Sequence, residues 1–270
     1  VLDTANGATY RVAPDTFNEL GASVEVIHKT PNGVNINDAC GSQHTEILRE
    51  KVVNSGAAIG LAFDGDGDRL IAIDEKGREI TGDQIMVICA NILKKEEKLK
   101  NDLLVTTVMS NLGLTVACKK YGFKHHASKV GDRYVLEDMR KLGGVIGGEE
   151  AGHMIFLEHH TTGDGIIAAL QLVAAMLKEG KPLSELAKMM DIFPQKLINV
   201  DVKRKPNIDE VPKLVEAIQQ VESELGEEGR VLVRYSGTQN MCRVMVEGPT
   251  DAVTEKYCRQ IADVVKSEIG

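Results

Sequence analysis

Strand-like and helix-like patterns alternate over the first 193 residues of the chain. Continuous apolar runs predict buried strands, the clearest being Ala57 to Phe63, which we expect to be parallel, and Leu103 to Val108. Apolar residues at helical spacing predict helices between such runs, the most apolar at Gly165 to Glu179. We expect further strands at 1–3, 70–74, 145–146 and 153–157, and helices at 15–20, 44–54, 84–95, 111–121 and 132–142. This alternation predicts three-layer α/β domains.

The pattern changes after Pro194. Strands are predicted at 197–202, 230–234 and 241–247, and helices at 211–225 and 252–268, which is typical of a small α+β unit with an antiparallel sheet. We therefore predict three domains with the boundaries 1–78, 79–193 and 194–270. The first two are α/β domains of similar architecture.

Composition narrows the possible functions. The net charge of -8 argues against a surface for nucleic acid or anionic membrane. Five cysteines without paired spacing argue against both a disulfide framework and a zinc site. The absence of a signal peptide and of a long apolar run predicts a soluble cytoplasmic protein. The chain opens on what reads as the end of a buried strand, so we expect it to derive from a longer protein.

The clearest chemical motif follows the first buried apolar run. Asp64, Asp66 and Asp68 alternate with glycines and are followed by Arg69. Glycine allows a tight turn, so three carboxylates can converge on one hard cation, and oxygen-only ligands favour Mg²⁺. Arg69 could then hold a phosphoryl oxygen. A solvated acidic turn is the alternative, whereas an EF-hand is disfavoured because Arg69 stands where that loop needs glycine.

Three weaker motifs contain groups that could bind a phosphorylated ligand. The segment 234–243 holds two arginines, two hydroxyls and a glycine, which could form a phosphate cradle: Arg234, Ser236, Gly237, Thr238 and Arg243. The glycine-rich segment 147–153 offers Glu149 and His153 to sugar hydroxyls. Lys129 precedes a predicted helix and could transfer a proton or contact phosphate. An ordinary hairpin turn, a strand corner and a surface lysine are the respective alternatives.

Taken together and in this order, the motifs resemble the α-D-phosphohexomutase superfamily over the whole chain. The closest resemblance is to its bacterial phosphoglucosamine mutase branch. The matching segments are 3–8, 35–37, 64–69, 108–113, 129–134 and 161–165.

The resemblance implies four domains around a cleft, the first of which carries a phosphorylated serine and would lie upstream of this chain. It implies that Asp64, Asp66 and Asp68 bind Mg²⁺, that Lys129 lies near the transferring group, where we also expect Arg69, and that the other named residues hold the substrate. Those residues are Glu149, His153, Arg234, Ser236, Gly237, Thr238 and Arg243.

The implied reaction interconverts glucosamine 6-phosphate and glucosamine 1-phosphate through a bisphosphorylated sugar, on the route to cell-wall precursors. The phosphoserine domain would be the partner of this chain, so we expect the chain alone to be inactive. A phosphomannomutase/phosphoglucomutase and a non-catalytic phosphosugar-binding fragment stay as alternatives. The oligomeric state is left open.

Two loops depart from the branch pattern. The sugar loop usually reads Gly-Glu-Gln-Ser-Gly-His, but Glu150 and Ala151 stand here in place of glutamine and serine. In the phosphate loop Tyr235, Gln239 and Asn240 replace two prolines and a glutamate. These changes put the sugar specificity in doubt.

Overall fold

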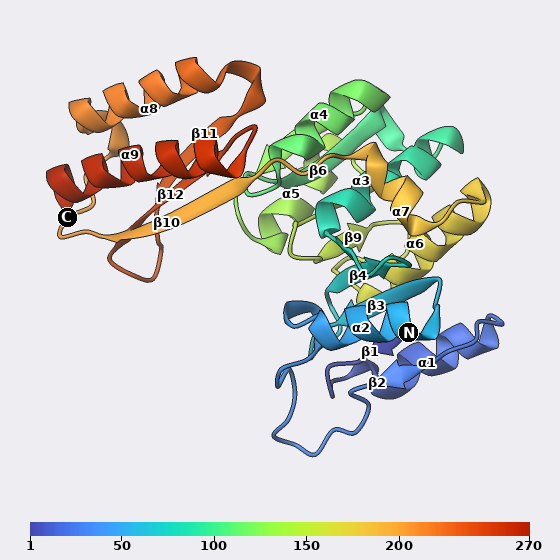
Figure 1. Ribbon diagram of the computed structural model, residues 1–270. Coiled ribbons are helices and arrows are strands. Elements are labelled where there is room, and N and C mark those ends of the chain that lie inside the picture. Colours follow the sequence, from blue (N-terminus) through green and yellow to red (C-terminus); the bar gives the residue numbers. More distant parts are fainter. The chain divides into compact units, whose positions relative to one another are not determined.

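The computed structural model describes all 270 residues and divides into two compact units (Figure 1). The first unit comprises Val1–Ser110 and Leu114–Asp191, and the second comprises Asn111–Gly113 and Ile192–Gly270. Mixed α/β structure with separate sheets confirms the predicted fold class. Short 3-10 helices lie at Gly41–Gln43, Lys100–Asp102, Ala187–Met189, Ile208–Glu210 and Gly226–Glu228.

A five-stranded sheet of order β2-β1-β3-β4-β5 forms the first part of unit 1. Its strands are β1 (Leu2–Asp3), β2 (Val26–Ile27), β3 (Ile59–Phe63), β4 (Leu70–Asp74) and β5 (Glu79–Ile80), with helices α1 (Thr9–Glu19) and α2 (Glu46–Ser55). β1 pairs in parallel with β2 and β3, whereas β4 is antiparallel to β3. Because Phe63 pairs with Leu70, residues 64–69 form the turn that joins these two strands.

A four-stranded sheet of order β7-β6-β8-β9 forms the rest of unit 1. Its strands are β6 (Leu103–Thr107), β7 (Lys124–Ser128), β8 (Ile146–Gly148) and β9 (Met154–Phe156). The helices are α3 (Gly82–Lys95), α4 (Leu112–Tyr121), α5 (Asp132–Leu142), α6 (Gly165–Glu179) and α7 (Leu183–Leu186). α6 contacts β4 of the first sheet and β9 of the second, and one apolar core runs through both parts. The two sheets therefore share a core.

Unit 2 is a three-stranded antiparallel sheet of order β10-β12-β11. Its elements are β10 (Gln195–Asp201), α8 (Pro212–Leu225), β11 (Arg230–Tyr235), β12 (Met241–Glu247) and α9 (Asp251–Ile269). The helices α8 and α9 lie side by side along the sheet (Figure 1). Their buried faces and β12 form a separate apolar core.

The bounds of β4, α5, α6 and β12 agree with the sequence prediction. The first helix was predicted wrongly at 15–20, because it begins at Thr9, runs through Pro14 and ends at Glu19. β7 was missed because its sequence, Lys-His-His-Ala-Ser, has almost no apolar signal. β3 pairs in parallel with β1, as predicted, although its other neighbour is antiparallel.

All five cysteines are buried, and each is a free thiol. No helix combines the length and the apolar character that crossing a bilayer requires.

A buried carboxylate organises one end of unit 2. Glu247 has no exposed surface and accepts hydrogen bonds from Arg230 Nε at 2.8 Å, Asn111 Nδ2 at 3.1 Å and Leu112 N at 3.1 Å. The Asn111 side chain also donates to Phe193 O and accepts from Phe193 N. A buried charge of this kind is stabilising only while its partners stay in place.

We predict that Glu247→Leu lowers the free energy of unfolding of unit 2 by about 3 kcal/mol, because it removes the acceptor of three donors. Denaturant unfolding followed by a probe in unit 2 measures this. The matched control is Glu255→Leu, which removes an exposed ion pair with Arg259 and should cost under about 1 kcal/mol. Equal effects of the two substitutions would contradict the role of Glu247.

Candidate functional site

The turn between β3 and β4, residues 64–69, is called the acidic loop. One carboxylate oxygen of each of Asp64, Asp66 and Asp68 lies within 4.8 Å of the others. The Oδ1 atom of Asp68 is buried and has no hydrogen-bond partner, and Arg69 Nε is buried in the same way. Oxygen ligands around an uncompensated negative centre fit a hard divalent cation such as Mg²⁺. The flanks of the loop are strands and not helices, so it is not an EF-hand.

Close backbone approach holds the acidic loop from two sides. Ala8 N donates to Gly65 O at 2.8 Å, and a Cβ atom on Gly7 would collide with the Gly65 backbone. On the other side Gly165 N donates to Gly67 O at 2.8 Å, and a Cβ on Gly165 would collide with Arg69 O. The glycines therefore matter because backbone atoms of other segments occupy the space of a side chain.

Burial makes one carboxylate of this loop, that of Asp64, harder to ionise. It raises the pKa of Asp64 to about 6, and the neighbouring Asp68 and Asp66 carboxylates add to that rise, while the N–H of Arg69 opposes it. Arg69 Nε lies 3.8 Å from both Asp64 Oδ2 and Asp68 Oδ1, so its charge is near the loop without a close hydrogen bond. The chain supplies too little positive charge to neutralise three carboxylates.

Residues 147–153, the glycine loop, are hydrogen-bonded to the acidic loop region. Leu70 N donates to Gly152 O at 3.0 Å, and Arg69 and His153 form an isolated β-bridge. His153 was predicted to read the sugar. The structure buries its side chain, with Nε2 at 3.5 Å from Asp68 Oδ2 and Nδ1 unpartnered. His153 therefore contacts the acidic loop.

A hydrogen bond at the start of α5 links the glycine loop to the segment that carries Lys129. In this bond Gly131 N donates to Glu149 Oε1 at 3.0 Å. Lys129 is exposed, and its Nζ lies 5.9 Å from the centre of the Tyr134 ring. The structure thus places Glu149, Lys129 and the acidic loop in one unit, around the ends of β3, β7 and β8.

The second group of predicted residues lies at the end of the β11–β12 hairpin. Arg234 and Arg243 are directly opposite each other on paired antiparallel strands. Burial lowers the pKa of Arg234, and the Arg243 charge lowers it further. Arg243 Nε is buried without a hydrogen-bond partner. Like charges at such a position are destabilising, so the pair favours an anion.

The turn at this end, residues 236–240, is called the Ser–Gly–Thr loop. Ser236 is buried, and its Oγ accepts a hydrogen bond from Gln239 N at 3.3 Å. Gly237 and Thr238 are exposed, and a Cβ atom on Gly237 would meet nothing within 4 Å. Arginines, hydroxyls and open backbone N–H groups suit a phosphate group.

A second cluster with metal-binding residue types has a different character. Asp3, His28 and Cys40 lie together, but Asp3 is fully buried and its carboxylate is already saturated. It accepts hydrogen bonds from Ala5 N, Gly41 N and His28 Nδ1, all between 2.9 and 3.0 Å. This cluster therefore stabilises the turn after β1, and Ala8 in that turn donates a hydrogen bond to the acidic loop.

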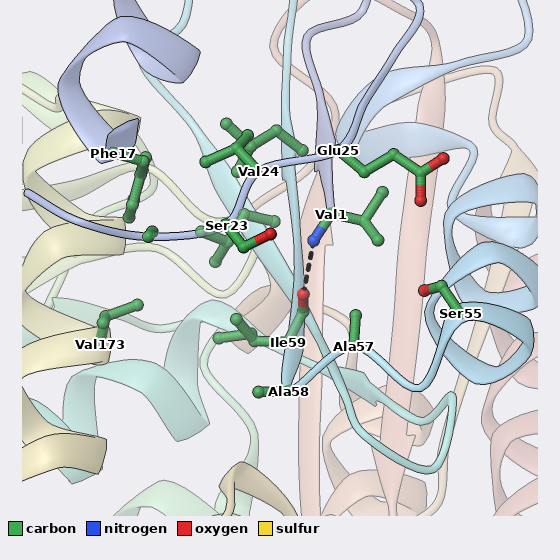
Figure 2. Close-up of a pocket in the computed structure, with 13 residues that line it drawn as sticks. Val1, Phe17, Ser23, Val24, Glu25, Ser55, Ala57, Ala58, Ile59 and Val173 are labelled. Atoms are coloured by element: carbon green, nitrogen blue, oxygen red, sulfur yellow. Dashed lines mark hydrogen bonds between the residues drawn. The ribbon is translucent and has the colours of Figure 1, made fainter. Parts of the chain in front are cut away.

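An apolar groove lies apart from the candidate site. It has a volume of about 580 Å³ and runs beside the start of β1, where Val1 N donates to Ile59 O at 2.9 Å (Figure 2). Its walls are mainly apolar side chains such as Phe17, Val24 and Val173, and Glu25 is its only ionisable side chain. Such a lining offers no set of donors for a phosphate and no set of oxygens for a cation.

Sequence reasoning missed several residues that shape these loops. Asn37 Nδ2 and Ile36 crowd the position that a Cβ on Gly65 would take, and Asn37 has a positive φ of 58°. Asp164 caps α6 by accepting from Ile166 N and Ile167 N, which fixes Gly165 against the acidic loop. The only sequence signal for them was that they lie in segments shared with the resembled superfamily.

Family models match almost the whole chain. They are described as phosphoglucomutase/phosphomannomutase α/β/α domain II at residues 1–77, α/β/α domain III at 81–193 and C-terminal domain at 197–264.

Curated relatives agree with this match. The chain is 75% identical over 270 residues to a phosphoglucosamine mutase of Syntrophobacter fumaroxidans and 65% identical to one of Syntrophus aciditrophicus. In both cases the whole chain aligns, and it spans 60% of the relative's length.

Solved structures show the same fold. An Aspergillus fumigatus N-acetylphosphoglucosamine mutase, solved with GlcNAc-6P and magnesium, has a TM-score of 0.77 at 20% identity and aligns with 98% of this chain and 65% of its own. A phosphoglucomutase/phosphomannomutase family protein of Burkholderia thailandensis has a TM-score of 0.77 at 19% identity, over 99% of this chain and 60% of its own. Because family models match nearly the whole chain and the curated relatives align with all of it, the chain belongs to the phosphoglucomutase/phosphomannomutase family.

Proposed function

We propose that this chain is part of a phosphoglucosamine mutase, which interconverts glucosamine 6-phosphate and glucosamine 1-phosphate. The observation that carries the proposal is the acidic loop, where one oxygen of each of three carboxylates lies within 4.8 Å of the others and Asp68 Oδ1 is buried without a hydrogen-bond partner. The 75% identity to a protein of that name supports the choice of sugar. Because the chain spans 60% of that relative, the activity is proposed for the longer protein.

In this proposal the acidic loop would hold Mg²⁺ through Asp64, Asp66 and Asp68. When bound, the ion would neutralise charge on the transferring phosphoryl group, which is the main requirement of this chemistry. Arg69, with its unpartnered Nε, would donate to a phosphoryl oxygen. His153 would read the sugar together with Glu149, from a position beside Asp68.

The remaining residues would bind the sugar and its second phosphate. Glu149 would accept hydrogen bonds from sugar hydroxyls while its Oε1 stays tied to Gly131 N. Lys129 would approach the transferring group and move a proton or balance its charge. The Arg234–Arg243 pair and the Ser–Gly–Thr loop, with Ser236, Gly237 and Thr238, would hold the phosphate that does not react.

The phosphoryl donor would be a phosphoserine on a separate domain, and the sugar would pass through a bisphosphorylated form. Turnover then needs two phosphate sites, because the sugar must present each of its ends in turn. In the proposal the acidic loop with its cation would receive the transferring phosphoryl group, and the arginine pair would hold the phosphate at the other end of the sugar. We also propose that the protein is cytoplasmic, as expected of an enzyme that acts on phosphorylated sugars.

A phosphomannomutase/phosphoglucomutase is the second candidate, because Ala151 is exposed in the glycine loop where the resembled branch has serine. We expect the longer protein to turn over glucosamine 6-phosphate at least tenfold more efficiently than mannose 6-phosphate, measured as kcat/KM. The 270-residue chain alone is the control and should show no turnover. Equal efficiency on both sugars would contradict the assigned substrate, and robust turnover by the chain alone would contradict the need for a phosphoserine domain.

The acidic loop makes a prediction about stability and pH. Since the pKa of Asp64 is raised to about 6 in the folded state, its contribution to stability is present below its ordinary value of 3.8 and lost as the pH rises through 6. Asp64→Asn should therefore stabilise the metal-free protein at pH 8, on the order of 1 kcal/mol, and leave its stability at pH 4 almost unchanged.

Thermal unfolding at pH 8 with and without Mg²⁺ tests whether Asp64 binds the metal ion. Mg²⁺ should raise the unfolding midpoint of the wild-type chain and of the exposed control Asp15→Asn, but not that of Asp64→Asn. An equal Mg²⁺ effect on all three proteins would remove Asp64 from the metal site.

The arginine pair makes a prediction about binding. Arg234→Ala should weaken the affinity of the chain for glucosamine 6-phosphate by about 2 kcal/mol, because one charged donor to phosphate is lost. Titration calorimetry measures this, with Arg259→Ala as the control because Arg259 is exposed in α9 of the same unit. An affinity unchanged by Arg234→Ala would rule out this phosphate site.

A further inference from the structure

A lysine that the sequence did not single out contacts both ends of the Ser–Gly–Thr loop. Lys205 lies in the segment that follows β10, and its Nζ donates to Ser236 O at 2.9 Å and to Gln239 O at 2.8 Å. Three residues earlier in the same segment, Val202 N donates to Asn240 O at 2.9 Å. Three carbonyl groups of the loop are thus turned toward the segment 202–205.

Holding the carbonyl groups also fixes the direction of the neighbouring N–H groups. In a trans peptide the C=O of one residue and the N–H of the next point in opposite directions. Because the Ser236 and Gln239 carbonyls face Lys205, the N–H groups of Gly237 and Asn240 face away from it. Neither N–H group, nor that of Thr238, has a hydrogen-bond partner within the chain. Such outward N–H groups are suited to an anion.

Most other hydrogen bonds of the loop are local: Ser236 N donates to Met241 O, Met241 N to Gln239 O, and Gln239 N to Ser236 Oγ. Residues 237–240 are all exposed, and no atom of another segment lies within 4 Å of the place that a side chain on Gly237 would take. No proline occurs between Tyr235 and Met241, although the resembled branch has two in this region. The two hydrogen bonds from the Lys205 ammonium group are therefore the only ones by which a side chain of another segment holds this loop.

The charge of Lys205 is also uncompensated. No carboxylate lies within 4.0 Å of its Nζ, whereas other lysines of this unit, such as Lys196 and Lys213, pair with a glutamate. Together with Arg234 and Arg243, Lys205 adds a third positive side chain to the ends of β10, β11 and β12. An anion at this end of the sheet would be attracted by all three.

We propose that Lys205 is a positioning residue for phosphate binding. It would hold the Ser–Gly–Thr loop so that the N–H groups of Gly237 and Asn240 point outward to the phosphate oxygens. This inference rests on the proposed function of the loop as a phosphate site. It is distinct from the role of Arg234 and Arg243, whose side chains would contact the phosphate directly.

The test compares Lys205→Met with Lys203→Met in the 270-residue chain. Both lysines are exposed in the same segment, and only Lys205 donates a side-chain hydrogen bond to the loop. Titration calorimetry with glucosamine 6-phosphate should show an affinity at least tenfold weaker for Lys205→Met and within about twofold of wild type for Lys203→Met. Lys205→Arg, which keeps charge and donors, should recover part of the loss.

A second measurement separates positioning from simple attraction of charge. The backbone ¹⁵N order parameters of residues 237–240 in the ligand-free chain should fall below about 0.6 in Lys205→Met and stay at the wild-type value in Lys203→Met. A weaker affinity with unchanged order parameters would overturn the positioning role, and so would an unchanged affinity.

Arg234→Ala distinguishes the failure of this inference from the failure of the proposed function. If Arg234→Ala weakens binding and Lys205→Met does not, only the role of Lys205 is wrong. If glucosamine 6-phosphate binds equally well to the wild type and to both variants, the loop is not the phosphate site, and the inference falls with it.

Discussion

Crowding of like charges is the constraint on which the rest of this structure depends. One carboxylate oxygen of each of the three aspartates in the acidic loop lies within 4.8 Å of the others, and two arginines are directly opposite each other on β11 and β12. Neither arrangement is favourable in an isolated chain, so the backbone around each must hold it in place. In the acidic loop the contacts of Gly7 and Gly165 with neighbouring backbone provide that support. The fold thus holds like charges close together at positions where a bound cation or phosphate would reduce their repulsion.

Much of the fold could be predicted because its buried elements have strong local patterns. The run before the acidic loop and the helix α6 are apolar enough to be recognised from one sequence, and the Asp–Gly alternation predicted a turn between two strands. Elements without such a pattern were missed or misplaced. β7 is a polar strand at the edge of its sheet, and only its pairing with β6 makes it a strand, while α1 runs through a proline that reads as a boundary. In both cases tertiary packing overrides local preference.

In the candidate site, too, local motifs could be predicted, whereas contacts that depend on tertiary packing could not. The residue types of the acidic loop and of the arginine pair were evident, since each motif is contiguous or lies on one hairpin. Partnerships between distant segments were not evident. The ring of His153 lies beside Asp68, and Lys205 contacts a loop 31 residues away, and neither contact was predicted. Neither periodicity nor composition predicts such a contact, because it depends on the tertiary fold that brings distant segments together.

The departures of the glycine loop from the resembled branch can be judged from its backbone. Glu150 O accepts a hydrogen bond from Gly82 N, and Gly152 O accepts one from Leu70 N, so the path of the loop is fixed by main-chain groups on both sides of residue 151. Replacing a serine by Ala151 therefore removes a hydroxyl without changing the course of the chain. The position of Glu149 and the contact of His153 with the acidic loop depend on that course and not on the side chain at 151. For this reason the substitution changes a side chain exposed on the glycine loop, whereas the contact of that loop with the acidic loop keeps its geometry.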